Sequence, residues 1–405
     1  MALKIALTTL ALACLSPFLW ERAQVLSLFW YNAPERLVRI DEFGSHEIKF
    51  SDRIRSCEDV VLVESVGVAI LACDPGRERW NTVMGVFEEG SLAHADLYIY
   101  DYKDTEASEE LSLKRVEFVD FKHEVDFHTL GLAFDESSST LYATSHRHDQ
   151  PAIEMFKLDL TAHTAKHLRS IQHELLHGPN AIAIINNHEF YVTNNNHFLV
   201  ADHPFLNHVE TYLGLPGGTV VHVDIMPQLV DPSSPVQANV VKRVPFANGI
   251  EIINQTTLAV ASSSHAAVYF FDVTAPTAPN TAPTLTHASK LRVPFMADNL
   301  SLSKDGRLMI AGHPHIISLS RFAKSRHVCN DPASLASASP QLQLECAKFT
   351  APSWVAEWTP EGGLKSLYAD TEYPSSATAV RDADRKVGIV AGLYAKGVMV
   401  WTETR

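Results

Sequence analysis

Basic residues are too few and too scattered in this sequence to form a nucleic-acid surface. Lysine and arginine total 33, against 47 aspartate and glutamate residues, and the formal net charge is −14. Proteins that bind nucleic acid depend on a basic stripe to neutralise phosphates, and no such stripe offsets the charge here. The composition therefore argues against nucleic acid as a partner.

Long hydrophobic runs are also lacking. The apolar run near the N-terminus, Ile5 to Leu15, follows a single early charge at Lys4 and is too short for an ordinary membrane span. Its pattern is that of a secretory signal or signal anchor. No small-x-small cleavage site follows, and a second apolar patch covers Val25 to Tyr31. We expect residues 1–30 to be a signal segment, either cleaved at an imperfect site or retained and membrane-associated.

Cysteine is scarce, with five residues in all. Cys14 lies in the N-terminal apolar segment, and the other four form two local pairs, Cys57 with Cys73 and Cys329 with Cys346. Local pairs are typical of secreted or lumenal chains, where disulfides persist. Four reduced, buried thiols are the alternative. The pairs predict two disulfides and a protein of the secretory pathway, secreted or on the lumenal or extracellular side of a membrane.

The sequence does contain a six-fold repeat. Val293 to Pro314 has a polar start, a strand, a turn and a second strand, and five other segments have the same plan. The polar starts fall at positions 58, 128, 180, 248, 298 and 376, which leaves room for four short strands per unit, the content of one propeller blade. We predict an all-β fold, a single six-bladed β-propeller over residues 31–405, with an N-terminal signal or anchor helix and a short helix near the channel mouth.

Three segments fall outside the repeat. Residues 36–56 carry strand-like pieces suited to closing the last blade, and residues 327–352 form an inserted loop with the second cysteine pair. Phe205 to Leu215 has apolar residues at helical spacing and predicts the short helix. We expect this helix and the N-terminal segment to form an apolar patch that docks on a membrane or lipid surface, although a helix packed on a blade edge is the alternative. The patch members are Leu7, Leu10, Leu12, Leu15, Phe18, Trp20, Phe205, Leu206, Tyr212 and Leu213.

The polar starts converge on the axis if the first strand of each unit lines a central channel. Asparagine and aspartate also start strands as ordinary turn residues, but that explanation fits one or two units better than five of six. Oxygen donors with two carboxylates suit calcium more than zinc. His128 shares the register and His146 ends the paired strand, so two imidazoles stand ready to deprotonate water and relay the proton. The residues predicted at the axis are Glu58, His128, Asn180, Asn248, Asp298 and Asn299.

These motifs resemble the paraoxonase/arylesterase family of calcium-dependent lactonases. The resemblance runs from about the signal segment to the C-terminus, and is carried by SCED at 56–59, FHTLGLAFD at 127–135, YATSH at 142–146, IQHELLHGPNAIAI at 171–184, FYVTNNNHF at 190–198, FANGI at 246–250 and ADNLS at 297–301. It implies a six-bladed propeller with two calcium ions in its channel. The residues that match catalytic calcium ligands are Glu58, Asn180, Asn248, Asp298 and Asn299. His128 and His146 match the family's histidine dyad, and Asp59 and the carbonyl of Leu130 match ligands of the inner, structural calcium.

The sequence departs from the family pattern at three places. Ala181 stands where the family has an acid, which removes one carboxylate from the structural calcium site and puts that second ion in doubt. The C-terminal GVMVWTETR lacks the cysteine that would join it to the N-terminal strand, so the local pairs take over as staples. Asn194 to His197 replace the family's Asp-His, which changes the residues around the mouth.

Two functions of different classes follow from these observations. The first is a calcium-dependent hydrolase of lactones and aryl esters, a carboxylic ester hydrolase in which His128 activates water and His146 relays the proton. A carboxylate, Glu58 or Asp298, acting as base or nucleophile is the other route. The second function is a non-catalytic propeller, pinned by calcium, that binds a protein or lipid partner. Two histidines beside an open metal favour the enzyme.

Overall fold

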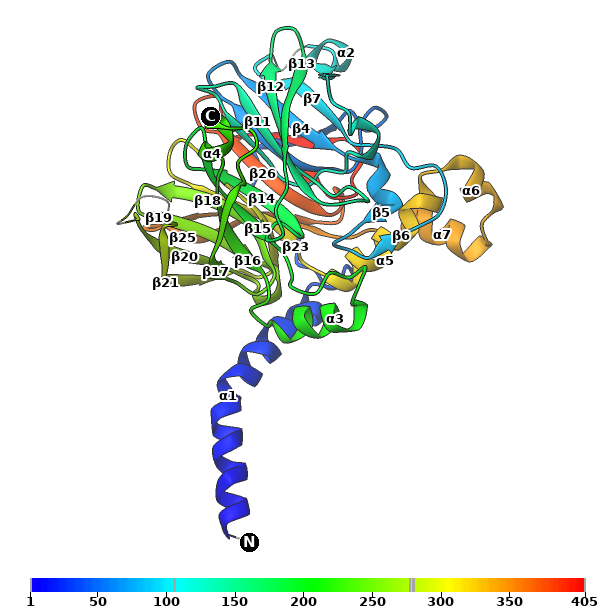
Figure 1. Cartoon of the computed structure of the whole chain (residues 1–405). Coiled ribbons are helices and arrows are strands. Elements are labelled where there is room, and N and C mark those ends of the chain that lie inside the picture. Colours follow the sequence, from blue (N-terminus) through cyan, green and yellow to red (C-terminus); the bar gives the residue numbers. More distant parts are fainter. Residues whose placement is uncertain (1, 105–106, 277, 279–280, 404–405) are drawn as a thin grey trace.

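The computed structural model of the chain describes residues 2–104, 107–276, 278 and 281–403. Side chains are described from Leu15 onward within these ranges, so the predicted patch members Leu7, Leu10 and Leu12 lie outside the described side chains. The body consists of six largely antiparallel sheets around one axis, with most of the longer helices at one end (Figure 1). The innermost strands, β3, β10, β14, β18, β22 and β26, contact one another in a closed ring. The predicted six-bladed propeller is confirmed.

Each blade consists of four main strands that follow one another from the axis outward. The first three blades contain β3 (Cys57–Val63), β4 (Val68–Cys73), β7 (Asp96–Asp101) and β8 (Leu113–Arg115); β10 (Leu132–Asp135), β11 (Thr140–Ser145), β12 (Ala152–Asp159) and β13 (Thr164–Ile171), with β9 (Glu117–Val119) at the edge; and β14 (Pro179–Ile184), β15 (Glu189–Asn194), β16 (Thr219–Asp224) and β17 (Gln237–Arg243). The fourth and fifth contain β18 (Ala247–Asn254), β19 (Thr257–Ser262), β20 (Ala267–Thr274) and β21 (Thr284–Arg292); and β22 (Met296–Leu302), β23 (Leu308–His313), β24 (Ser353–Thr359) and β25 (Gly363–Asp370), with β1 (Ile40–Asp41) at the edge.

The last blade is completed by the N-terminal part of the chain. Its strands are β26 (Ser376–Asp382), β27 (Val387–Gly392), β28 (Val398–Thr402) and β2 (Ser45–Lys49). Strand β2 pairs antiparallel with β28, with Ser45 opposite Thr402. Within the predicted range of 36–56, residues 45–49 close the last blade as expected, whereas residues 40–41 pair with the outer strand of the fifth blade.

The core is divided among the six interfaces between neighbouring blades. Second strands such as β4 and β27 are buried along their whole length, because both of their faces pack against adjoining blades. Their sequences, VAILAC and VGIVAG, are short continuous runs of apolar residues and glycine, as fully buried strands require. One apolar cluster, for example, joins Leu71 of the first blade to Ile389 of the last. Five similar clusters join the remaining pairs of blades.

The helices lie mainly at one end of the axis. Helix α3 (Pro204–Leu213) confirms the predicted short helix to within two residues at its C-terminal end. The prediction of an inserted loop over 327–352 was wrong, because most of this segment is helical. Its helices are α5 (Ile316–Cys329), α6 (Pro332–Ser337) and α7 (Pro340–Lys348). Asp331 and Ser339 cap α6 and α7, and each is followed by proline at the first helical position. A capping residue followed by proline is a helix-start signal, and both signals lie outside the repeat from which the fold was predicted. The remaining short elements are α2 (Glu109–Ser112), α4 (Met226–Val230), η1 (Pro75–Glu78), η2 (Glu124–Asp126), η3 (Ser263–His265), β5 (Trp80–Asn81) and β6 (Val86–Phe87).

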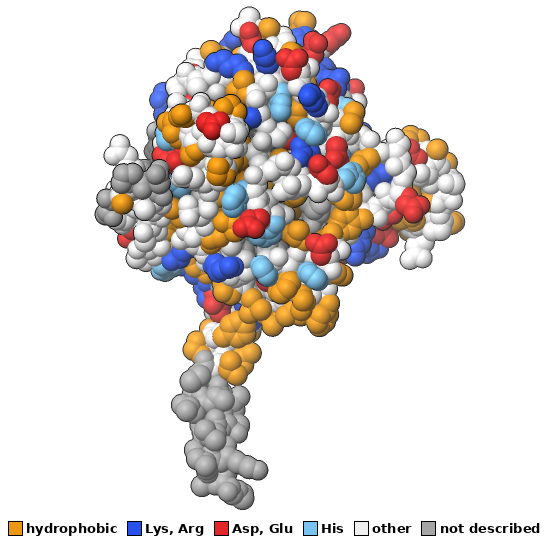
Figure 2. Space-filling model, in the orientation of Figure 1, with side chains coloured by type: hydrophobic (Ala, Val, Ile, Leu, Met, Phe, Trp, Pro, Cys, Tyr) orange, Lys and Arg blue, Asp and Glu red, His pale blue; other side chains and the backbone are white. Residues whose placement is uncertain are grey.

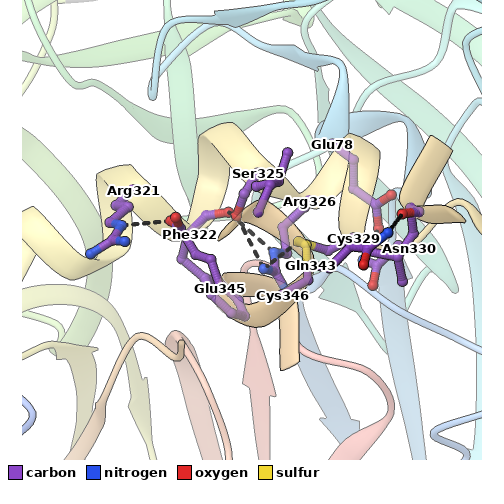
Figure 3. Close-up of a disulfide and its surroundings, with 12 residues drawn as sticks. Glu78, Arg321, Phe322, Ser325, Arg326, Cys329, Asn330, Gln343, Glu345 and Cys346 are labelled. Atoms are coloured by element: carbon purple, nitrogen blue, oxygen red, sulfur yellow. Dashed lines mark hydrogen bonds and ion pairs between the residues drawn. A yellow bond between two sulfur atoms is a disulfide. The ribbon is translucent and has the colours of Figure 1, made fainter. Parts of the chain in front are cut away.

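Both predicted disulfides are present. Cys57 pairs with Cys73 across the first inner hairpin. Cys329 pairs with Cys346 and ties α5 to α7, next to the Arg326 guanidinium, which lies 3.0 Å from the Cys329 sulfur (Figure 3). The neighbouring Asn330 donates a 2.8 Å hydrogen bond to Glu78, which anchors this helical insertion to the first blade.

The N-terminal helix α1 (Ala2–Tyr31) leaves the body at the helical end (Figure 1). Its last two turns lie against the propeller, where Val25 is buried with Ala266 and Met296. Within the described part of the chain, no helix combines the length and the apolar character needed to cross a membrane.

Candidate functional site

A repeated irregularity positions the polar residues at the axis. Five of the six innermost hairpins lose their pairing register where the polar residues stand, between Cys57 and Asp59 in the first blade and between Pro179 and Ile182 in the third. A bulge of this kind turns side chains away from the regular pleat, and bulges are common beside functional sites. The residue just before the inner strand is also distorted in the first and fourth blades, since Ser56 and Phe246 have positive φ angles. The local fold therefore directs Glu58, Asn180, Asn248 and Asp298 toward the channel.

These four residues line one cavity of about 80 Å³ at the helical end of the channel. Glu58, Asn180, Asn248 and Asp298 are each at least 95% buried. Three of their oxygens have no hydrogen-bond partner among the described residues, namely Glu58 Oε2, Asn180 Oδ1 and Asn248 Oδ1. A buried oxygen without a partner is costly. Three of them lining one cavity fit a hard cation such as calcium, which takes carboxylate and amide oxygens.

The charges at this cavity also suit a cation. Burial raises the pKa of Glu58 well above its usual range, and the neighbouring carboxylates of Asp59 and Asp298 raise it further. Asn299 donates a 2.9 Å hydrogen bond to Glu58 Oε1 but lines the cavity at the opposite end of the channel. His313 Nε2 lies 2.7 Å from Asp298 Oδ2. A positive ion at the floor of the cavity would offset the repulsion between Glu58 and Asp298.

The inner site for a second ion does not fit. Asp59 already accepts hydrogen bonds on both oxygens, from the backbone of Val60 and Leu132 and from the Thr378 hydroxyl, at 2.7 to 3.0 Å. Burial raises its pKa to about 6. Ala181, at the position where an acid would help, packs in an apolar cluster. Leu130, whose carbonyl was the other expected ligand, lies at the cavity of the helical end.

His128 is held by a partner that the sequence did not indicate. Its Nδ1 lies 3.1 Å from Asp74 Oδ2, and both side chains are 98% buried. Its Nε2 has no hydrogen-bond partner in the part of the chain that is described. Strand β10 begins only at Leu132, so His128 precedes the inner strand instead of opening it. It lines a pocket of about 10 Å³ that shares Asn81 and Leu130 with the axial cavity.

His146 lines the same small pocket but does not hydrogen-bond to the His128 ring. Its Nε2 lies 2.6 Å from the Pro179 carbonyl, and its Nδ1 lies 2.6 Å from the Thr82 hydroxyl. A carbonyl only accepts, so Nε2 carries the proton and Thr82 donates to Nδ1. Burial lowers the pKa of His146 to about 4. The imidazole is therefore neutral at physiological pH.

This lowered pKa predicts how stability depends on pH. An unfolded histidine takes up a proton near pH 6.5, but folded His146 does so only near pH 4. Its contribution is full above pH 6.5 and is lost as the pH falls toward 4, by up to about 3 kcal/mol. We expect His146→Gln to flatten the pH dependence of the unfolding free energy in this window. Urea unfolding at several pH values measures it, and an unchanged slope contradicts the assignment, with His203→Gln as the exposed control.

A second group of polar side chains adjoins His128. Ligand atoms of Asp126, His128 and His148 lie within 4.8 Å of one another. Asp126 pairs with His148, which stacks on Trp80 with ring centroids 3.9 Å apart. This group is distinct from the oxygens on the cavity floor, and of its members His128 lines the small pocket.

Sequence reasoning missed several residues of the site: Arg22, Asp74, Arg77 and His313. Asp74 and His313 stand where the second strand of an inner hairpin ends, the position that His146 occupies in its own blade. Applying that position to every repeat would have found them. Arg77 is 99% buried with its Nε and Nη1 unpartnered among the described residues, and no repeat position marks it. Arg22 comes from α1, outside the repeat.

Comparison with known proteins shows which family this sequence resembles. The sequence model of the arylesterase family matches residues 90–336, more than half of the chain. Serum paraoxonase/arylesterase 2 of Canis lupus familiaris is 30% identical over 45% of this chain and 48% of that protein. Serum paraoxonase/arylesterase 1 of Mus musculus is 30% identical over 45% and 47%. The match thus spans about half the length of these curated relatives.

Solved structures of low sequence identity also resemble the chain. A gluconolactonase from Xanthomonas campestris has a TM-score of 0.48 and 11% identity, and covers 90% of this chain and 93% of its own. The periplasmic gluconolactonase of Pseudomonas aeruginosa has a TM-score of 0.44 and 9% identity, over 85% and 80%. Both scores lie below 0.5, so neither structure bears on activity. On the sequence match, this chain belongs to the arylesterase family.

Proposed function

We propose that the chain is a calcium-dependent hydrolase of lactones and aryl esters. The observation that carries this proposal is the convergence of three unpartnered oxygens, from Glu58, Asn180 and Asn248, on one buried cavity with Asp298. A propeller that only binds a partner has no use for unpartnered buried oxygens next to a buried Asp74–His128 pair. Family membership supports ester hydrolysis as the reaction class.

Glu58, Asn180, Asn248 and Asp298 would hold one calcium ion, and Asn299 is the fifth proposed ligand. Bound there, calcium supplies positive charge that polarises a substrate carbonyl and stabilises the developing oxyanion. His313 positions the Asp298 carboxylate through its 2.7 Å contact, as hydrogen bonds commonly do for ligating carboxylates. No second ion enters the proposal.

His128 is the proposed general base. Its Nδ1–H donates to Asp74, so Nε2 keeps the lone pair that takes a proton from water, while the Asp74 carboxylate stabilises the imidazolium that forms. The pocket of about 10 Å³ beside Nε2 has room for roughly one water molecule. The water oxygen bonds to the carbonyl carbon, the carbon–oxygen bond to the leaving group breaks, and Nε2–H returns its proton to that group. The role proposed for His146, relay of the proton, stays a prediction.

The walls of the axial cavity indicate the kind of substrate. Above the polar floor the lining is largely apolar, from the N-terminal helix, α5 and the inner loops. Such a wall selects a compact ester or lactone with an apolar body. The apolar lining residues include Val25, Leu26, Phe29, Met84, Leu130, Phe246, Met296 and Leu319.

Hydrolysis with and without chelator tests the proposal. We expect the purified full-length chain to hydrolyse phenyl acetate and a γ- or δ-lactone, to lose that activity in EDTA and to regain it on adding calcium. The EDTA-treated protein also serves as its own control for spontaneous hydrolysis. Activity that EDTA leaves intact would remove calcium from the proposal, and hydrolysis of neither substrate class would favour the non-catalytic propeller.

We place the protein in the secretory pathway, at a lumenal or extracellular lipid surface. Two disulfides are typical of an oxidising compartment. Apolar side chains are exposed around the mouth on α1 and α3, and form the hydrophobic surface at the base of the body in Figure 2. An exposed apolar patch of this kind marks a lipid or partner surface. Its members include Leu19, Trp20, Leu26, Trp30, Phe205, Leu206, Tyr212 and Leu213.

Vesicle binding should depend on this patch. Phe205 on α3 is 76% exposed, and Leu111 on α2, at the far end of the body, is 68% exposed (Figure 1). We expect the wild-type chain to sediment with phosphatidylcholine vesicles, Phe205→Asp to reduce the sedimented fraction severalfold, and Leu111→Asp to leave it unchanged. Equal binding by both variants, or no binding by the wild type, would contradict a lipid-docked mouth.

A further inference from the structure

One cation at the axial cavity has no role in the chemistry described so far. Arg22, on the last turns of α1, is 96% buried and lines the cavity whose floor carries Glu58 and Asp298. Its Nη1 donates a 2.7 Å hydrogen bond to the Ser264 carbonyl. Its Nε and Nη2 have no hydrogen-bond partner among the described residues, and neither has the Ser264 hydroxyl. Three donors are therefore unused at one end of the cavity.

The nearby carboxylates are committed to other groups. Glu21, the neighbour of Arg22 in sequence, pairs with Lys290 and lies 3.8 Å from Arg292. On the cavity floor, Asp298 contacts His313 and Glu58 accepts from Asn299. Burial lowers the pKa of Arg22, against the opposing charge of Glu21. The guanidinium is thus a buried charge that forms no ion pair among the described residues, because Glu21 is already paired with Lys290. Such a charge is expensive to bury unless a ligand supplies a counter-ion.

The surrounding backbone holds this guanidinium in place. Gly214, the residue after α3, has a φ angle of +64°, and a Cβ there would lie 2.5 Å from Arg22 Nη1 and 2.7 Å from Cζ. Glycine therefore permits both the turn and the close approach. With the Ser264 carbonyl bound to Nη1, the edge formed by Nε and Nη2 is left free. Two parallel N–H groups on one edge match the two oxygens of a carboxylate.

We propose that Arg22 and Ser264 form a carboxylate-binding subsite, and that the preferred substrate is a lactone or ester that carries a carboxylate apart from its scissile bond. The inference rests on the proposed function, because it places the scissile carbonyl at the floor of the same cavity. The subsite adjoins that floor, since Ser263, next to Ser264, accepts a 3.0 Å hydrogen bond from the Asn248 amide. Because Arg22, Ser264 and the floor residues line one cavity of about 80 Å³, the proposed substrate is small and contacts both ends.

A matched pair of lactones tests the subsite. One is γ-butyrolactone with a carboxylate on the ring carbon beside the ring oxygen, and the other has a methyl group there. The readout is the ratio of kcat/KM for the acid to kcat/KM for the methyl compound. We expect Arg22→Gln to lower this ratio about tenfold or more, because a hydrogen-bonded charge pair is lost. Arg22→Lys keeps the charge but loses the two-pronged edge, and is expected to lower the ratio severalfold.

Arg292→Gln is the matched control. It removes the same charge close to Arg22, but Arg292 is half-exposed and does not line the cavity. We expect it to leave the ratio unchanged. The proposal is overturned if the Arg22 variant that folds has the same ratio as the wild type. It is also overturned if Arg292→Gln lowers the ratio as much as the Arg22 variants do.

Binding of benzoate, measured by calorimetry, separates failure of the subsite from failure of the proposed function. If the chain hydrolyses neither lactone, the proposed function fails. The subsite then stands only if the wild type binds benzoate and the Arg22 variants bind it at least about tenfold more weakly. Hydrolysis of the methyl lactone without any preference for the acid leaves the function intact and removes the subsite. Equal benzoate binding by the wild type and the variants also removes it.

Discussion

Replacing Asp298 with alanine is expected to lower ester and lactone hydrolysis by a factor of about 10³ or more, since calcium at such a site contributes several kcal/mol to the transition state. Among the described residues that line the cavity, Asp298 supplies one of two carboxylates. Its loss leaves Glu58 and the three neutral amides of the proposed ligand set, with half the negative charge. Initial rates over a calcium titration measure the effect.

Thermal unfolding gives a second readout for Asp298 that does not depend on activity. A ligand that binds only the folded state stabilises it in proportion to the logarithm of its concentration. We expect calcium to raise the melting temperature of the wild type and to do so much less in Asp298→Ala. Without calcium the variant escapes the repulsion between Asp298 and Glu58 that helps to raise the pKa of Glu58. Asp384→Ala, at an exposed ion pair with Lys304, is the control. Full activity of Asp298→Ala at limiting calcium, or an equal calcium shift, would falsify the proposed site.

Replacing His128 with glutamine is expected to lower kcat by about 10²–10⁴-fold, the usual cost of losing a general base. Glutamine keeps much of the volume but cannot take up the proton, and the loss should appear in kcat more than in KM. His203→Gln, in the loop before α3, is the exposed control. The pH profile of the remaining activity should lose the ionisation that belongs to the base.

Two further variants separate the possible bases. Asp74→Asn removes the carboxylate partner of His128, and we expect it to resemble His128→Gln with a smaller loss. His313→Gln should weaken calcium binding through Asp298, so added calcium should restore much of its activity. If His128→Gln and His203→Gln show equally small losses, the base is elsewhere, and a floor carboxylate such as Glu58 becomes the alternative.

The repeat was visible in the sequence because each blade must bury the same kind of strand at the same place. Alternating and continuous apolar runs gave the six hairpins, and the polar residue before each run gave Glu58, Asn180, Asn248 and Asp298. The bulges that turn these side chains inward could not be predicted, because they depend on pairing between strands. The offset of His128 has the same origin: β10 starts late, and its hairpin is regular where the other five are not.

Periodicity in the sequence could not reveal the residues that only tertiary structure brings to the site. Asp74 reaches His128 from the first blade across 54 positions. Arg22 reaches Ser264 across 242 positions, because α1 packs over the mouth. The helices of the insertion were predictable in principle, since Asp331 and Ser339 each precede a proline at a helix start, but the cysteine pair drew the interpretation toward a loop.

The pairing of β2 with β28 has a consequence for how the chain reaches its folded state. Ser45 and Thr402, whose hydroxyls hydrogen-bond at 2.7 Å, are 357 positions apart. The last blade therefore cannot form until nearly the whole chain has been synthesised, and such distant pairing is slow. Until then the first blade exposes the apolar face that later packs against the last, an aggregation-prone state of the kind that chaperones shield. Removing only residues 398–403 should leave a nascent chain that stays chaperone-bound, because β2 then has no partner strand and the last blade stays incomplete.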